Sequence, residues 1–220
     1  DPVYLQRARE LCDRYHVHLI LDEIAVGFGR TGSLFAHQQA GIRPDFLCLS
    51  KALTGGYLPL SGVLTTDAVY AAFYDDQTAR GFLHSHSYTG NPLACRAALE
   101  VLDIFRDEDV LARNVATARM LDERLATLRA HAAVRHARHI GMIWAFDIDV
   151  PDAAAFSSRL HRQALARGLL LRPIGATLYL MPPYALDEAA LDHLAAGTLA
   201  ALDAALADAS LPASGDLPLP

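Results

Sequence analysis

The stretch Val17-His-Leu-Ile-Leu-Asp22 is an apolar run that ends in a carboxylate, and Asp45-Phe-Leu-Cys-Leu-Ser-Lys51 is a second run that ends in an amine. Short apolar runs of this kind are typical of strands that lie buried in a parallel sheet. The carboxyl ends of parallel strands meet at one edge of an α/β sheet, where such folds bind their ligands. We therefore expect Asp22 and Lys51 to lie close together at that edge.

A lysine and an aspartate in this arrangement suit pyridoxal phosphate chemistry. The amine can form a Schiff base with the cofactor, and an aspartate on the pyridine nitrogen keeps it protonated, so that the ring accepts electrons. Both residues also have an ordinary interpretation. A lysine beside an apolar run is usually solvated, and Asp-Glu after a strand often forms a turn or a helix cap. The two residues alone do not decide between these interpretations.

Three longer motifs add context to this pair. They are Leu21-Asp-Glu-Ile-Ala-Val-Gly-Phe-Gly-Arg-Thr-Gly32, Leu49-Ser-Lys-Ala-Leu-Thr-Gly-Gly-Tyr-Leu-Pro-Leu60 and His86-Ser-Tyr-Thr-Gly-Asn-Pro-Leu-Ala94. In this order they resemble the class III aminotransferases, from about Leu19 to about Leu206. The resemblance implies an α/β fold of the fold-type I pyridoxal-phosphate-dependent transferases. The chain would hold the second half of the large, mostly parallel-sheet domain and a small α+β C-terminal domain.

The resemblance also implies roles for particular residues around the cofactor. Lys51 would be catalytic and hold pyridoxal 5'-phosphate, while Asp22 would meet the pyridine nitrogen. Ile24 would pack on the cofactor ring, although an ordinary core isoleucine would fit the same pattern. His86 and Ser87 match the place where such enzymes contact the cofactor phosphate of the neighbouring subunit, since a hydroxyl or an amide suits phosphate oxygens. This implies a homodimer with the active site at the subunit interface.

The segment Leu169-Leu-Leu-Arg-Pro-Ile-Gly-Ala-Thr-Leu-Tyr-Leu-Met-Pro-Pro-Tyr184 resembles the branch of the family that serves biotin biosynthesis. That branch transaminates the keto acid 8-amino-7-oxononanoate, with S-adenosylmethionine as the expected amino donor. Arg172, which we expect at a strand end, offers a planar fork for the substrate carboxylate, with Tyr179 across the pocket. Arg172 could instead pair with an acidic residue at a domain interface. Lys51 and Ser85 would also contact substrate, but Ser85 stands where these enzymes usually carry glycine.

Two alternatives remain open at this point. One is another class III aminotransferase, acting on an ω-amino acid or a diamine, which would share Asp22 and Lys51 but need not share Arg172. The other is an inert C-terminal fragment, because members of the family are roughly twice as long and the phosphate-binding Gly-Ser segment would lie in the other half. We expect this chain to be the C-terminal half of such an enzyme.

Composition narrows the class of protein further. The 220 residues are 52% hydrophobic, which allows a real core, and the net charge of −6 makes nucleic acid an unexpected partner. No run of about 18 apolar residues predicts a membrane span. The three cysteines have apolar neighbours and favour reduced, buried thiols in a cytoplasmic protein; they are Cys12, Cys48 and Cys95. His16 with His18, and His84 with His86, lack a third ligand, so we expect no metal site.

Periodicity predicts the order of the elements. We expect helices at about 2–15, 35–40 with Ser33 as cap, 92–105 with Asn91 as cap, 110–128, 152–166 and 187–206. We expect strands at about 17–21, 46–49, 62–64, 142–148, 169–172 and 177–181. The predicted domains are 1–107 for part of the cofactor-binding domain and 108–207 for the small domain, with a disordered tail at 208–220.

Overall fold

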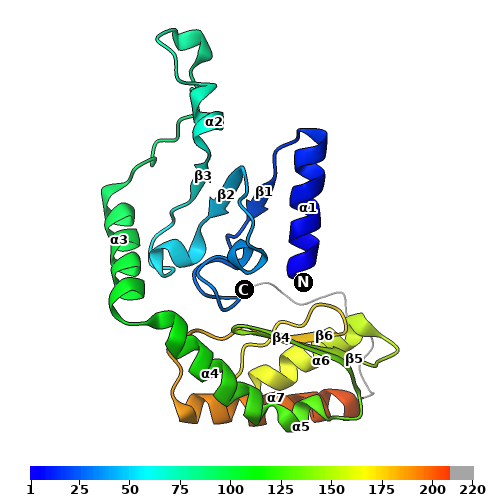
Figure 1. Ribbon diagram of the computed structural model, residues 1–220. Helices are drawn as coiled ribbons and strands as arrows, with labels where there is room; N and C mark the ends of the chain where they lie inside the picture. The colour runs from blue at the N-terminus through cyan, green and yellow to red at the C-terminus, as the bar shows by residue number, and fades with distance from the viewer. Residues whose placement is uncertain (209–220) are drawn as a thin grey trace. The chain divides into compact units, whose positions relative to one another are not determined.

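The computed structural model describes residues 1–208, and the chain divides into two compact units (Figure 1). The first is Asp1–Arg113 and the second begins at Asn114. Our assignment of 1–107 to a cofactor-binding domain and 108–207 to a small domain stays a prediction. The predicted disordered tail lies outside the described residues, apart from Asp208, which caps the last helix.

The first unit contains a three-stranded sheet in the order β1-β2-β3. Strands β1 (Ile20–Asp22) and β2 (Phe46–Leu49) are parallel, and β3 (Gly62–Thr65) runs antiparallel to β2. Strands therefore form close to where the sequence predicts them. The expectation that β1 is buried is wrong, because Ile20 is 61% exposed. A parallel strand is buried only where both faces are covered, and Ile20 points away from the small apolar cluster of this unit.

Helix α1 (Pro2–Tyr15) has the predicted bounds. The Asp1 side chain caps it by accepting the Val3 N–H, and Pro2 suits the first turn because its missing N–H would have no partner there. His16 ends the helix in the left-handed conformation, at φ 53°. The strand predicted from position 17 begins later, at Ile20, so neither His16 nor His18 lies in a strand.

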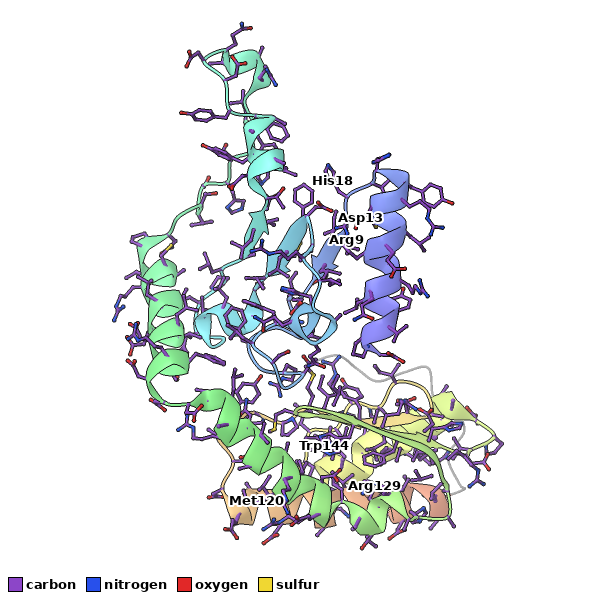
Figure 2. The ribbon with its side chains drawn as sticks, in the orientation of Figure 1. Arg9, Asp13, His18, Met120, Arg129 and Trp144 are labelled. Carbon is purple, nitrogen blue, oxygen red and sulfur yellow. The ribbon has the colours of Figure 1, made fainter. Side chains whose placement is uncertain are left out.

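Arg9 fastens α1 to the start of the sheet. Its guanidinium donates to Asp45 Oδ2 at 2.8 Å and pairs with Asp13 Oδ1 at 2.7 Å, on the side of α1 near His18 (Figure 2). Asp45 also accepts the Leu19 N–H at 2.7 Å. The Leu19 N–H, and then Arg9, lower the pKa of the Asp45 carboxyl, since both favour its charged form.

The rest of the first unit consists of short helices and α3. They are η1 (Ala36–Ala40), η2 (Lys51–Thr54), α2 (Asp67–Ala71), η3 (Thr78–Arg80) and α3 (Pro92–Asp107). Asn91 caps α3 as predicted, because its Oδ1 accepts the Leu93 and Ala94 N–H groups. The predicted Ser33 cap is wrong. Phe35 is the N-cap of η1, and its N–H is bound by the Gln38 side chain at 3.0 Å.

The second unit packs helices on an antiparallel sheet in the order β4-β5-β6. Its elements are α4 (Val110–Arg124), whose first four residues precede the boundary at Asn114, and then α5 (Ala126–Arg129), β4 (Val134–Ile140), β5 (Ile143–Ile148), α6 (Ala153–Leu165), β6 (Thr177–Leu180) and α7 (Glu188–Ala207). Alternate residues of β5 and β6, such as Trp144, Phe146 and Leu178, enter one core with the helices. This alternation is the period of a sheet with one buried face.

Two sequence predictions for this unit are wrong, and one strand was missed. The helix predicted over 110–128 is interrupted at Leu125, which separates α4 from α5. Strand β4 was not predicted, because its residues are mostly polar and exposed. No strand forms at 169–172: Leu169 and Leu171 are buried, but this segment pairs with no strand, and Pro173 follows without an N–H to donate.

Helix α7 is long and apolar enough to cross a membrane by length and composition alone. Its apolar residues have another explanation within the second unit. Leu191, Ala201 and Leu202 are fully buried in the core cluster, where α7 packs on α6 and α5.

The three cysteines are free thiols, as expected. Their predicted burial is wrong for Cys95, which is exposed on α3, and only partly right for Cys12 and Cys48, which are half-buried. The apolar neighbours of Cys95 in the sequence do not all share its face of the helix, because neighbouring positions of a helix point in different directions.

Candidate active site

The sheet of the first unit brings Asp22 and Lys51 to one edge. Asp22 is the last residue of β1 and lies beside Cys48 of β2, three positions before Lys51. The pairing continues past Asp22, since the Glu23 N–H donates to the Cys48 carbonyl at 3.0 Å. Both side chains are exposed at the carboxyl end of a parallel pair, where α/β folds place their ligands.

Lys51 has an unusual backbone. Its φ is 47°, in the left-handed region that costs a residue with a side chain about 1–2 kcal/mol. The surrounding turn imposes this conformation: the Ser50 hydroxyl donates to the Leu60 carbonyl at 2.7 Å, and the Gly56 N–H donates to the Lys51 carbonyl at 3.3 Å. Strain of this kind collects at functional positions, where the rest of the fold supports it.

The carboxylate of Asp22 has a fixed orientation. Its Oδ1 accepts the Ile24 N–H at 2.9 Å. This contact closes a turn across Glu23 and sets the rotamer of Asp22. Ile24 is half-buried, which fits packing on a ring or on its own unit equally well.

Glu23 is a residue that the sequence interpretation missed. It follows Asp22 directly but is only 3% exposed, and its carboxylate binds the start of η1. The only sequence feature that could have drawn attention to Glu23 was its position directly after Asp22. Its partner His37 lies far along the sequence and shows no local pattern that predicts the contact.

Ser85, His86 and Ser87 lie in the exposed connection that follows η3. His86 organises this connection, since its N–H donates to Thr89 Oγ1 at 3.2 Å and its ring accepts the Tyr88 N–H at 3.2 Å. Within residues 1–208, no hydrogen bond joins these three residues to Asp22 or Lys51. Their predicted contacts with phosphate and substrate stay predictions.

The predicted substrate residues belong to the second unit. Arg172 is exposed and, contrary to expectation, does not end a strand. It precedes a tight turn in which Ile174 pairs with Thr177 and Gly175 adopts φ 57°. Tyr179 lies in β6, opposite Ala145 of β5, and is half-buried.

A charged network orders the sheet face that carries Tyr179. Asp147 accepts two hydrogen bonds from Arg138, at 2.5 and 2.8 Å, and one from the Thr177 hydroxyl at 2.8 Å. Arg138 and then Thr177 lower the pKa of Asp147 to about 2, because both stabilise the carboxylate. Thr177 shares its face of β6 with Tyr179, two positions on.

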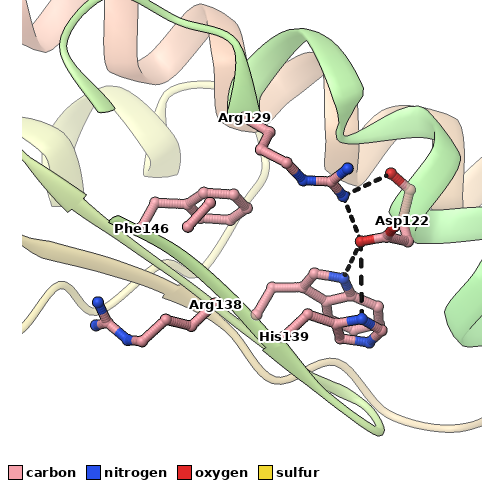
Figure 3. Close-up of a pocket in the computed structure, with 7 residues that line it drawn as sticks. Asp122, Arg129, Arg138, His139 and Phe146 are labelled. Carbon is pink, nitrogen blue, oxygen red and sulfur yellow. Dashed lines mark hydrogen bonds and ion pairs between the residues drawn. The ribbon is translucent and has the colours of Figure 1, made fainter. Parts of the chain in front are cut away.

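A small cavity of about 160 Å³ lies elsewhere in the second unit, between α4–α5 and the β4–β5 hairpin (Figure 3). Asp122 accepts hydrogen bonds from Trp144 Nε1 at 3.1 Å and from Arg129. His139 stacks on Trp144 with ring centroids 4.6 Å apart. None of the predicted site residues lines this cavity. Its carboxylate, Asp122, is already bound by Trp144 and Arg129, so the cavity is not a candidate active site.

The residues at the edge of β1 and β2 fit pyridoxal phosphate. Lys51 supplies an amine for the cofactor carbonyl, and Asp22 supplies a carboxylate of fixed rotamer for a protonated pyridine nitrogen. Within the described part of the chain, no three His, Cys, Asp or Glu side chains lie close enough together to bind a metal ion.

Comparisons with known proteins agree with this chemistry. The model of the class III aminotransferase family matches residues 1–202. The adenosylmethionine-8-amino-7-oxononanoate aminotransferase of Helicobacter pylori is 47% identical over 188 residues, which are 83% of this chain and 43% of that protein. The enzyme of the same name from Aquifex aeolicus is 37% identical over 196 residues, 85% of this chain and 43% of its own length.

Solved structures show the same likeness. The adenosylmethionine-8-amino-7-oxononanoate aminotransferase of Methanocaldococcus jannaschii superposes with a TM-score of 0.83 at 33% identity, over 91% of this chain and 49% of its own. The omega transaminase of Pseudomonas jessenii, solved in complex with PMP, reaches 0.87 at 26% identity, over 93% of this chain and 47% of its own. The chain thus spans a little under half the length of the curated relatives it matches.

These comparisons confirm the predicted α/β fold of the fold-type I transferases and the dependence of the family on pyridoxal phosphate. They also explain why the motifs around Asp22 and Lys51 occur in the order seen in the sequence. The chain belongs to the class III aminotransferases.

Proposed function

We propose that this chain is the C-terminal part of an aminotransferase that converts 8-amino-7-oxononanoate to 7,8-diaminononanoate in biotin biosynthesis. The observation that carries the proposal is the placement of Asp22 and strained Lys51 at one edge of a parallel strand pair. The names of the relatives from Helicobacter pylori and Aquifex aeolicus support this substrate.

In this proposal, Lys51 and Asp22 divide the work at the cofactor. Bound pyridoxal phosphate supplies an electron sink for the pair of electrons that remains when a C–H proton leaves. Lys51 Nζ would hold the cofactor in the resting enzyme and, when free, would act as the base that moves the proton of the substrate carbon. Asp22 would keep the pyridine nitrogen protonated, and Ile24 would pack against the ring.

Other residues have proposed roles with the substrate. Arg172 would bind the carboxylate of the keto acid through its planar fork, and Tyr179 is the second residue proposed to contact the substrate. Ser85 lies near the reacting end, where its side chain takes more room than glycine. His86 and Ser87 contribute to the phosphate contact of a neighbouring subunit. S-adenosylmethionine is the proposed amino donor.

The partners of the protein follow from the same assignment. We expect a cytoplasmic homodimer with its active site at the subunit interface, small-molecule substrates, and neither nucleic acid nor membrane as partner. Exposed aromatic residues on 66–88 support a covered surface there; they include Tyr70, Phe82 and Tyr88. The three free thiols support a reducing compartment.

Another class III activity is the second candidate. The likeness to solved omega transaminases, with TM-scores up to 0.87, supports an ω-amino acid or diamine as substrate. Such an enzyme would use Asp22 and Lys51 in the same way but would not need Arg172. A third possibility is that the chain as printed is an inert fragment that folds without holding the cofactor.

The experiment that separates these candidates is an absorbance spectrum of the intact gene product with pyridoxal phosphate, before and after borohydride reduction. A band fixed onto Lys51, with diaminononanoate formed from 8-amino-7-oxononanoate and S-adenosylmethionine, supports the proposal. A fixed band without that product leaves an aminotransferase of another substrate. No band on the 220-residue chain, with a band on a longer gene product, identifies the printed chain as an inert part.

A further inference from the structure

Glu23 has the most completely bound carboxylate of the first unit that the proposed mechanism does not use. Its Oε2 accepts the Ala36 N–H at 2.6 Å, and its Oε1 accepts the His37 N–H at 2.9 Å. The ring nitrogen Nδ1 of His37 lies 2.7 Å from the same Oε1. A carboxylate that accepts two backbone N–H groups and lies within hydrogen-bond distance of a ring nitrogen is held in one orientation.

The backbone of Glu23 is equally constrained. Its N–H donates to the Cys48 carbonyl at 3.0 Å, and its own carbonyl accepts the Gly27 N–H at 2.9 Å. A Cβ at Gly27 would lie only 2.9 Å from the Glu23 carbonyl oxygen, so this turn needs glycine. Glu23 therefore joins three segments of the unit: β2, the loop that contains Gly27, and η1.

The pair of Glu23 and His37 is shielded from water. The two side chains are 3% and 13% exposed. The His37 ring stacks on Phe35, with centroids 5.9 Å apart and planes at 10°, and Phe35 contacts Phe28 edge to face. In such surroundings an ion pair or hydrogen bond is strengthened, and removing one partner leaves the other unpaired at high cost.

Asp22 and Glu23 place two carboxylates side by side in the sequence, but only one carboxylate is needed at the pyridine nitrogen. Asp22 and Glu23 are neighbours, and either could in principle meet a protonated pyridine nitrogen. The bonds to η1 and His37 direct the Glu23 carboxylate inward, while the Asp22 carboxylate remains exposed. The same bonds hold the turn from which the Ile24 N–H reaches Asp22 Oδ1.

We infer that Glu23 and His37 form a positioning pair that holds Asp22 in place for the pyridine nitrogen of pyridoxal phosphate. This inference rests on the proposed function, since it assigns the pair to the cofactor contact of Asp22. Glu23 and His37 themselves touch neither cofactor nor substrate.

The test uses the intact gene product with the substitutions Glu23→Gln, His37→Ala and, as matched control, Asp45→Asn. Asp45 is also a half-shielded, ion-paired carboxylate that accepts a backbone N–H, but it lies at the opposite end of the same strands, beside Leu19. Three quantities are measured: the dissociation constant of pyridoxal phosphate, from its visible absorbance; the hydrogen exchange of residues 20–28 in cofactor-free protein; and the free energy of unfolding.

Glu23→Gln puts an N–H group against a backbone donor, and we expect it to weaken pyridoxal phosphate binding at least about tenfold, by analogy with the loss of a residue that orients a metal ligand. Hydrogen exchange of 20–28 increases in the same variant. His37→Ala removes the ring beside the carboxylate but leaves both backbone N–H groups, so it has a smaller effect in the same direction. Asp45→Asn lowers the free energy of unfolding but leaves the dissociation constant unchanged.

Two results overturn the inference. In the first, Glu23→Gln binds pyridoxal phosphate as the unmodified protein does. In the second, Asp45→Asn weakens binding as much as Glu23→Gln, which would show a general loss of stability. An unmodified protein that holds pyridoxal phosphate but forms no diaminononanoate overturns only the proposed substrate. One that holds no pyridoxal phosphate overturns the cofactor role of Lys51 and this inference together.

Discussion

The two units of this chain differ in how fully they bury their own apolar residues. The second has a continuous core to which its helices and its sheet contribute, with Leu121, Phe156 and Leu202 at 0% exposure. The buried apolar cluster of the first unit is only Phe28, Leu47 and Leu49. The first unit also exposes many large apolar side chains, among them Tyr57, Val63, Leu64, Phe82 and Leu83. Extensive exposed apolar surface marks a place where further protein binds.

The candidate chemistry lies in the unit with the smaller core. Asp22 and Lys51 are carried by short strands and turns, and these are supported by hydrogen bonds more than by packing. The second unit carries Arg172 and Tyr179 on a framework that packs by itself. The comparison predicts that the edge proposed to hold the cofactor needs more apolar contact than its own unit supplies, whereas the proposed substrate residues lie on a unit that packs by itself.

The largest expected effect comes from separating the units. Residues 114–208 should unfold cooperatively with a free energy of about 5 kcal/mol, a usual value for a small domain, because their core is complete. Residues 1–113 should bind an apolar dye and show no sharp transition. Circular dichroism and dye fluorescence on each piece check this. A cooperative first unit that binds no dye would remove the contrast between the units.

Core substitutions should show a graded version of the same contrast. Leu121→Ala should cost about 3 kcal/mol, since it leaves a cavity in a fully buried site, and Leu47→Ala about 2 kcal/mol. Trp144 is the single tryptophan of the chain and lies in the second unit, so its fluorescence reports that unit during denaturant unfolding. If Leu47→Ala moves the Trp144 transition as much as Leu121→Ala, the units unfold as one and the comparison fails.

Lys51 allows a test of strain in the first unit. Lys51→Gly should be about 1 kcal/mol more stable than Lys51→Ala, because glycine adopts the left-handed φ without steric cost. Borohydride should not fix pyridoxal phosphate to either variant, because both lack the amine of Lys51. Far-ultraviolet circular dichroism in denaturant measures the difference in the intact gene product. Equal stability of the two variants would mean that the backbone at position 51 is not strained.

The smallest expected effect is in the pH dependence. The pKa of Asp147 is about 2 in the folded protein, below its ordinary value of 3.8, so its stabilising contribution is complete above about pH 4 and is lost as the pH falls toward 2. Arg138 and Asp147 are 51% and 34% exposed, so solvent screening keeps this contribution under about 1 kcal/mol. Asp147→Asn should flatten the acid limb of the Trp144 transition, and Asp45→Asn should not. An acid limb that is unchanged in Asp147→Asn would mean that this carboxylate does not contribute.

The sequence predicted those parts of the fold whose signals are local. The cap Asn91 and the apolar run Phe46–Leu49 predicted α3 and β2 closely, because caps and apolar runs act over a few residues. Strand β4 could not be predicted, since its partner β5 supplies the reason for its extended conformation. The segment 169–172 has the composition of a strand, but the core buries it without strand pairing.

The site was predictable to a similar extent. Motifs in the sequence indicate Asp22 and Lys51, and the topology brings them to one edge. The contacts of Glu23 with Ala36 and His37 were not predictable, because they join segments that only the folded loop brings together. The left-handed φ of Lys51 also has no sequence signal, since lysine does not favour that conformation.

Helix α7 has a consequence for the synthesis of the protein. The three strands that the first unit contributes have all been translated once Thr65 is reached, but the core of the second unit joins Leu121 of α4 to Leu202 of α7. At 5–20 residues per second, a ribosome needs roughly 4 to 16 s to cover that distance. During this interval the apolar faces of β5 and β6 stay partly exposed, because α7 has not yet been made. The nascent chain should therefore need a chaperone most just before α7 emerges.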